Sequence, residues 1–188
     1  MSLTSSDYGF QIGQALKAVS HLHSDTSKLL LDCDKHVGKG RRSLFGNFVT
    51  RDLTYSVKAD FWMPEGVYRY YDAGSMIVDA ITVTFFMPES SGDPDSVPQP
   101  LFTAGRIRYP DVKGPNSVDV KNLCDAWDLW WVFFKGAPTP ELERIFEGTD
   151  LDNGRIAWAR CITVPLFSIS SIEDVITLMA RISEQDTK

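Results

Sequence analysis

The eight residues "WDLWWVFF", from Trp127 to Phe134, place the strongest constraint on what this chain can fold into. They hold three of its five tryptophans and two of its eleven phenylalanines. In a helix over residues 118–135, apolar side chains would cover roughly two-thirds of the circumference. Each buried aromatic side chain removes about 150–250 Å² from water. We therefore expect this segment to lie in the interior, between a sheet and another helix.

An aromatic platform for stacking nucleic-acid bases is one alternative for the same segment. The strip of the predicted helix that stays polar includes Asp125 and Asp128, whose charges would repel phosphate. The whole chain carries a net charge of −6, whereas binding to phosphates depends on Lys and Arg. We therefore do not expect nucleic acid as a partner. An interface with a protein partner or with a second copy is the other alternative.

A long amphipathic helix is predicted from Asp7 to His36. Its stripe consists of two seven-residue series, Ile12, Val19, Thr26 and Cys33, and Ala15, Leu22, Leu29 and His36. Two polar members of the stripe favour a helix docked on the domain over a coiled coil. Gly38 and Gly40 are expected to end the helix.

The rest of the chain alternates between strand patterns and helix patterns. Strands are expected at residues 54–61, 67–71, 75–87, 101–109 and 155–167, and further helices at 118–135, 140–146 and 171–182. Four prolines in residues 88–100 predict a mobile loop. Because local hairpins join several strands, we predict one α+β domain over residues 1–188. Its mostly antiparallel sheet would have about five strands, with helices packed largely on one face.

The cysteines and the apolar runs indicate a compartment. Cys33, Cys124 and Cys161 are odd in number and far apart, which is typical of reduced thiols. The start of the chain lacks the blocks of a signal peptide, and no apolar run approaches the ~20 residues of a membrane span. We expect a soluble, cytoplasmic protein with no membrane contact.

One enzymatic candidate lies in "YPDVK", residues 109–113. It resembles the Asp/Glu-x-Lys half-motif of restriction-endonuclease-like nucleases, with Asp79 as the earlier carboxylate. The resemblance implies that Asp79 and Asp111 hold Mg²⁺ while Lys113 supports the attacking water. The sequence departs from the motif because a glycine and a proline follow Lys113, where the family has a strand. The Pro-Asp pair is also an ordinary turn.

Asp79 falls in the apolar row of the predicted strand 75–87, beside Ile77 and Ile81. A carboxylate in such a row must be paired, protonated or placed at the end of the sheet. We expect Asp79 to lie at the end of the sheet.

The basic stretch 35–43 is a candidate anion site. Its glycine amides and the cations Lys39, Arg41 and Arg42 could cradle a phosphate or meet an acidic partner. It does not match the phosphate-binding P-loop, and a solvated loop explains it equally.

These patterns lead to a first functional expectation and two alternatives. The chain contains no dinucleotide fingerprint, nucleophile elbow or zinc-ligand set, so we expect no cofactor. We predict a small non-catalytic binding or adaptor protein that acts through protein–protein contacts or self-association. The alternatives are a metal-dependent nuclease using Asp79, Asp111 and Lys113, and a nucleotide or anion binder using the 35–43 loop.

Overall fold

An antiparallel sheet forms the centre of the structure, a computed structural model that describes residues 5–47, 66–85, 99–111, 119–125, 128, 143–147 and 155–183. The strands are β1 (Gly66–Gly74), β2 (Ile77–Thr84), β3 (Leu101–Arg108), β4 (Glu143–Glu147) and β5 (Trp158–Pro165). Their order in the sheet is β1-β2-β3-β5-β4, and every neighbouring pair is antiparallel. The α+β class and the antiparallel sheet predicted from the sequence are confirmed.

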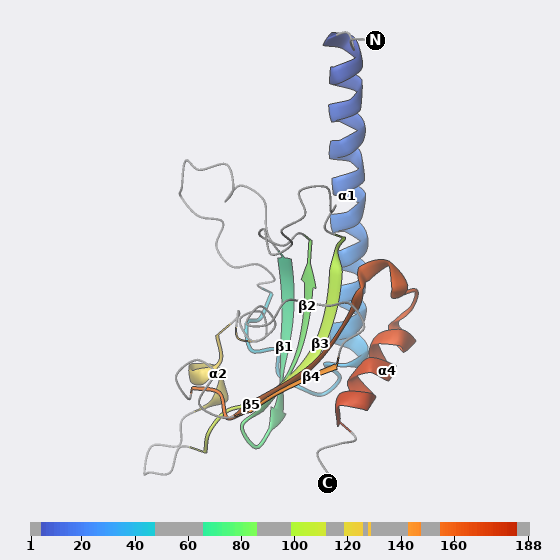
Figure 1. Cartoon of the computed structure of the whole chain (residues 1–188). Coiled ribbons are helices and arrows are strands. Elements are labelled where there is room, and N and C mark those ends of the chain that lie inside the picture. The colour runs from blue at the N-terminus through green and yellow to red at the C-terminus, as the bar shows by residue number, and fades with distance from the viewer. Residues whose placement is uncertain are drawn as a thin grey trace.

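The first face of the sheet packs against two helices, α1 (Ser5–His36) and α4 (Ile172–Ser183) (Figure 1). Strand alternation selects the side chains on this face, since residues two apart point the same way. The resulting core joins the sheet residues Ile81, Val83 and Phe102 to Leu30 and Cys33 of α1 and to Val175, Leu178, Met179 and Ile182 of α4. Burial of these side chains is the main stabilising contribution on this face.

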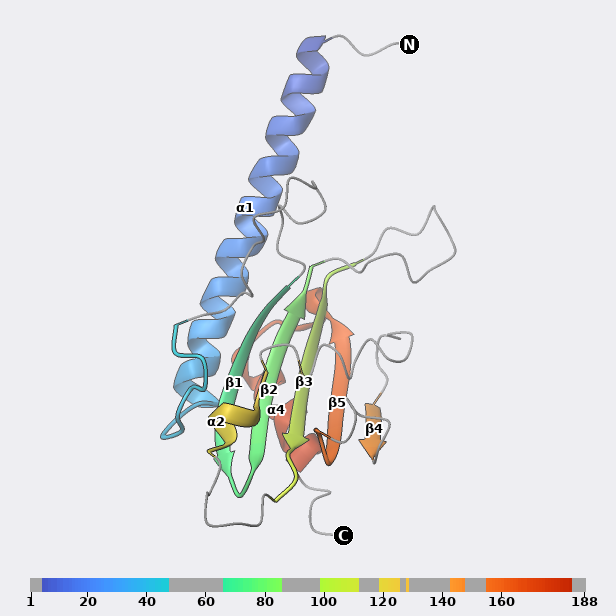
Figure 2. The ribbon, with the colours of Figure 1, turned by 90° about the vertical axis from the view of Figure 1, so that its left-hand side faces the viewer.

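The second face of the sheet is also covered. The short helix α2 (Val120–Leu123) lies on the side of the sheet opposite α4 (Figure 2). Val120, Cys124 and Leu44 pack there against strand residues that include Tyr68, Tyr70, Val78, Ala80, Ile107 and Cys161. The two longer helices therefore share one face, while α2 and the loop that contains Leu44 contribute to the other.

A tight turn joins β1 to β2. Ser75 and Met76 have φ angles of 51° and 62°, and Gly74 has a φ of 81°. Two central residues with positive φ are typical of type I′ turns, whose twist matches that of the flanking strands. The strand predicted from residue 75 therefore begins two residues later, because the turn takes Ser75 and Met76.

α1 ends where the sequence predicts, and its end lies close to the sheet. The amides of Val37 and Gly38 both donate to the Cys33 carbonyl oxygen. A Cβ atom at Gly38 would lie 2.5 Å from the ring of Tyr71, so only glycine fits this close approach. None of the helices in the described ranges combines the length and the apolar character needed to cross a membrane.

Two predicted helices differ from the structure. The helix expected over 118–135 is interrupted: α2 ends at Leu123 and Cys124 is extended, with φ −71° and ψ 127°, whereas Asp128 is helical again. The helix expected at 140–146 is wrong, since Glu143–Glu147 form β4 and pair with β5. Pairing with the exposed edge of β5 overrides the local helix pattern there.

Other predictions fall outside the described residues. These are positions 127 and 129–134 of the tryptophan-rich segment, the strand at 54–61, and residues 88–98 of the predicted loop. The interior location predicted for the tryptophan-rich segment therefore remains a prediction.

Candidate functional site

The first half of α1 extends beyond the sheet (Figures 1 and 2). Every side chain from Asp7 to Ala18 is exposed, and we call these residues the projecting half of α1. Its large apolar side chains are among the most exposed of the described residues. The exposed fractions are 55% for Tyr8, 68% for Phe10, 59% for Ile12 and 66% for Leu16.

The exposed apolar side chains of the projecting half do not all lie on one side. Tyr8, Ile12 and Leu16 follow one another at intervals of four, so they share a face. Phe10 lies about 200° around the helix from Ile12, on the opposite side. We call the face formed by Tyr8, Ile12 and Leu16, with Ala15 beside them, the contact face of the projecting half.

The second half of α1, residues 19–36, is docked on the domain. Thr26, Leu30 and Cys33 are buried, and Leu22 and Leu29 pack at the margin of the core. Polar contacts add to this packing. Asp34 accepts hydrogen bonds from Arg69, at 2.6 Å, and from the Tyr71 hydroxyl, at 2.8 Å. We call residues 19–36 the docked half.

A groove of about 780 Å³ adjoins the docked half. It runs between α1 and the segment that follows β5, which includes the short 3-10 helix η4 (Leu166–Ser168). Its apolar lining comes from Ala18, Val19, Leu22 and Leu29 on one wall and Leu166, Phe167, Ile169 and Ile172 on the other. Phe167 is 73% exposed at this groove. Its volume is within the range of about 300–1,000 Å³ that ligand pockets occupy. We call it the α1 groove.

The projecting contact face and the α1 groove meet at Val19, which begins the docked half and lines the groove. Together they form a continuous apolar surface along one helix. Exposed apolar patches of this kind mark sites of protein contact.

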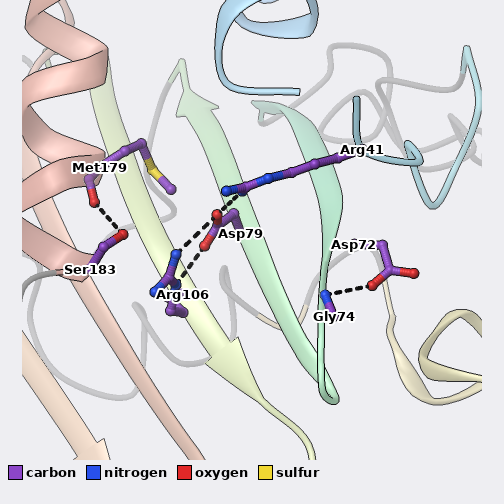
Figure 3. A network of polar contacts seen from close by, with 7 residues as sticks. All are labelled: Arg41, Asp72, Gly74, Asp79, Arg106, Met179 and Ser183. Carbon is purple, nitrogen blue, oxygen red and sulfur yellow. Dashed lines mark hydrogen bonds and ion pairs between the residues drawn. The ribbon is translucent and has the colours of Figure 1, made fainter. Parts of the chain in front are cut away.

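Asp79 is buried on the helix-facing side of the sheet, between two arginines (Figure 3). Arg106 donates to Oδ1 at 2.7 Å and to Oδ2 at 3.2 Å, and Arg41 donates to Oδ2. Asp79 lies two residues into β2, near one end of the strand, and its carboxylate there is both buried and paired. The physical reason is that two guanidinium groups compensate the charge inside the domain.

The other proposed nuclease residues lie in different surroundings. Asp111 follows β3, and its exposed carboxylate lies 3.5 Å from Arg108. Lys113 lies outside the described residues. Within the described ranges, no three of the His, Cys, Asp and Glu side chains are grouped so that they could hold a metal ion.

The cations of the basic loop contact acidic side chains of the domain. Arg41 pairs with Asp79, and Arg42 pairs with Asp72 at 3.1 Å and Asp119 at 2.7 Å. The Arg42 guanidinium holds the pKa of Asp119 at about 2. These ion pairs hold the loop against β1, where Ser43 also forms a bridge with Tyr71.

Lys39, the third predicted cation, is exposed. Arg41 and Arg42, in contrast, are paired with carboxylates, so the basic loop offers an anion less positive charge than the sequence suggests.

A second buried polar cluster lies at the other face of the sheet. Asp128 accepts hydrogen bonds from the Tyr109 hydroxyl, from Arg155 and from the Asp125 amide. Burial raises the pKa of Asp128, and it raises the pKa of Cys124 to about 12. A thiol with so high a pKa is a poor nucleophile. The geometry supports a structural role instead: the hydrogen bonds to Asp128 hold the segment around Cys124 against the sheet.

The sequence predicts that Asp128 lies on the polar strip of a helix. Asp128 is helical, but the structure buries its side chain completely, and Tyr109, Arg155 and the Asp125 amide donate hydrogen bonds to its carboxylate. Tyr109 and Arg155, which complete the cluster, come from distant parts of the sequence. No spacing pattern links them, so the cluster could not be read from the sequence.

Comparison with known proteins gives no family: no family model, no curated protein and no solved structure matches the chain.

Proposed function

We propose that this protein is a small binding or adaptor protein without catalytic activity, and that the projecting half of α1 is its contact surface. The observation that carries the proposal is the exposure of Tyr8, Ile12 and Leu16 on one face of a helix that extends beyond its own domain. Water contact with such side chains is unfavourable by about 25 cal/mol per Å² of apolar surface. A partner that covers this face would remove that cost.

The rest of the described structure supports binding more than catalysis. Both oxygens of Asp79 accept hydrogen bonds from arginine side chains. A carboxylate engaged in this way has less capacity to hold Mg²⁺. The thiol of Cys124 stays protonated near neutral pH, because burial raises its pKa to about 12. The binding proposal is therefore preferred to the nuclease alternative.

We also infer that the protein works in a reducing compartment such as the cytoplasm. Cys33, Cys124 and Cys161 are all free and buried. Buried free thiols suit a compartment in which disulfides do not form.

The proposal is tested by affinity capture with a pair of matched variants. Ile12→Glu places a charge on the contact face, and Ile176→Glu places one on an exposed position of α4. A partner captured by the wild type and by Ile176→Glu, but lost with Ile12→Glu, would support the proposal. Circular dichroism should show that both variants fold. If every captured species is unaffected by Ile12→Glu, the contact surface is not the projecting half.

A further inference from the structure

We propose that the projecting half of α1 binds a second copy of the same chain, with the two α1 helices antiparallel and each helix tip seated in the partner's α1 groove. This inference rests on the proposed function, because it identifies the partner that the contact surface takes. The tip is the part of the projecting half that carries Tyr8 and Ile12.

The apolar stripe of α1 runs through both halves of the helix. In the docked half the stripe residues Leu22, Thr26 and Cys33 are wholly or partly covered by the chain's own core. The same seven-residue pattern continues to Ile12 in the projecting half, where it is exposed. The exposed stripe of the projecting half therefore has the same spacing as the stripe that packs in the docked half. A second helix with this spacing can pack against it.

The area that the two helices can bury decides the direction of the pair. A stable dimer buries at least about 1,000 Å². Helices that met only along residues 7–18 would share a contact roughly 18 Å long and 10 Å wide, which is too small. In a parallel pair each tip lies beside the partner's tip, so neither tip reaches the partner's α1 groove, whose lining begins at Ala18.

An antiparallel pair lengthens the contact. Each tip then runs past the partner's projecting half and reaches the level of the partner's α1 groove, between Val19 and Leu29. The groove, of about 780 Å³, has room for more than one side chain of the tip. A two-fold axis repeats this contact, so both tips and both grooves are filled.

The charges along α1 are compatible with self-association. The whole chain has a net charge of −6, which opposes self-association at most of the surface. The projecting half carries one acid, Asp7, and one base, Lys17. In the groove, Asp25 and Asp32 are paired with Lys28 and Lys35, at 2.8 Å each. Two copies can therefore meet along α1 without net repulsion.

The oligomeric state of the full chain tests the proposal first. Analytical ultracentrifugation across a concentration series should show a species of twice the chain mass of 21.1 kDa. Ile12→Glu combined with Leu16→Glu should raise the dissociation constant about a hundredfold or more. Phe10→Glu is the matched control, since Phe10 is equally exposed but lies on the other side of the helix. It should leave the dimer nearly unchanged.

Thiol cross-linking tests the direction. A mixture of Tyr8→Cys and Phe167→Cys proteins should cross-link between chains, because the tip of one copy lies in the groove of the other. Tyr8→Cys alone should not cross-link to itself, because the two tips lie at opposite ends of the pair. Self-cross-linking of Tyr8→Cys without the mixed product would overturn the antiparallel arrangement.

The outcomes separate this inference from the proposed function. A chain that stays monomeric, yet captures a partner that Ile12→Glu loses, would refute self-association and keep the binding function. A monomeric chain whose captured partners are unaffected by Ile12→Glu would refute both. A dimer that the paired glutamates leave intact would refute α1 as its interface.

Discussion

The two halves of α1 belong to one helix and share one seven-residue pattern, yet they lie in opposite environments. Leu30 in the docked half is 4% exposed, whereas Leu16 in the projecting half is 66% exposed. The pattern marks which face of the helix is apolar in both halves. Whether that face is covered depends on where the sheet ends and on what other chain is present. The predictions below test this difference between the two halves.

The largest expected difference is in thiol reactivity. Burial raises the pKa of Cys33 to about 12, from an ordinary value of 9.0. At about pH 8 this lowers its thiolate fraction roughly a thousandfold relative to an exposed cysteine. Ala15→Cys places a thiol on the projecting half, and it should react with iodoacetamide faster by about that factor, as measured by peptide mass spectrometry. Equal rates would mean that the docked half opens readily.

The same burial makes stability depend on pH. The folded chain holds the Cys33 proton more tightly than the unfolded chain does, so this contribution to stability is complete below about pH 9. It is lost as the pH rises toward about 12, and the same holds for Cys124. Denaturant unfolding at a series of alkaline pH values should show the loss. Replacing both cysteines with alanine should make the decline shallower.

Truncation of matched leucines gives the next largest effect. Leu30→Ala removes a buried side chain and should lower the free energy of unfolding by about 2–5 kcal/mol. Leu16→Ala removes an exposed one and should change it by less than about 0.5 kcal/mol under conditions where the chain is monomeric. Urea unfolding measures both values. Similar losses in the two variants would mean that the projecting half is covered by its own chain.

The polar contact of the docked half should contribute less. Asp34→Asn weakens the contacts with Arg69 and Tyr71, and Arg69 has only 8% of its side chain exposed. We expect a loss of about 1–3 kcal/mol, because a buried charge is left without its ion-pair partner. The control is Asp25→Asn, because the ion pair of Asp25 with Lys28 is on the surface and its loss should change stability much less. Urea unfolding of both variants measures the two losses of stability. Equal losses would mean that the contact of Asp34 with Arg69 contributes no more than a surface ion pair.

The smallest effect is expected from the glycines of the projecting half. A Cβ at Gly9 or Gly13 would meet no atom within 4 Å. Each Gly→Ala substitution should therefore stabilise the helix locally by about 0.5–1 kcal/mol. Amide exchange should slow in residues 7–18 and stay unchanged in residues 19–36. Faster exchange, or a weaker dimer, would show that these positions need to be small.

The sequence predicted much of the framework but less of the candidate site. The strands around Tyr70, Ile81 and Ile107 were recognised because alternation of apolar and polar residues follows directly from the pleat. The predicted helix over 140–146 was wrong, because pairing with β5 is a contact between distant segments. Asp79 was singled out correctly as unusual, but its partners Arg41 and Arg106 could not be named. They are 38 and 27 residues away in the chain.

The projecting half was missed for a related reason. A stripe of apolar residues reads the same whether it is docked or free, so the prediction treated the helix from Asp7 to His36 as docked throughout. One signal was present: Phe10 and Leu16 lie outside the two seven-residue series, and a helix that docks by one stripe rarely needs them.

By itself, the amino-acid sequence determined the local features of this protein: the extent of α1, the strand character of β1, β2, β3 and β5, and the end of α1 near Gly38. Periodicity and backbone preference are properties of neighbouring residues, so they can be read along the chain. The tertiary structure alone decided which half of α1 is buried, which charges meet Asp79 and where the groove beside Val19 opens. Those features depend on distances between segments far apart in the sequence, and no spacing rule encodes them.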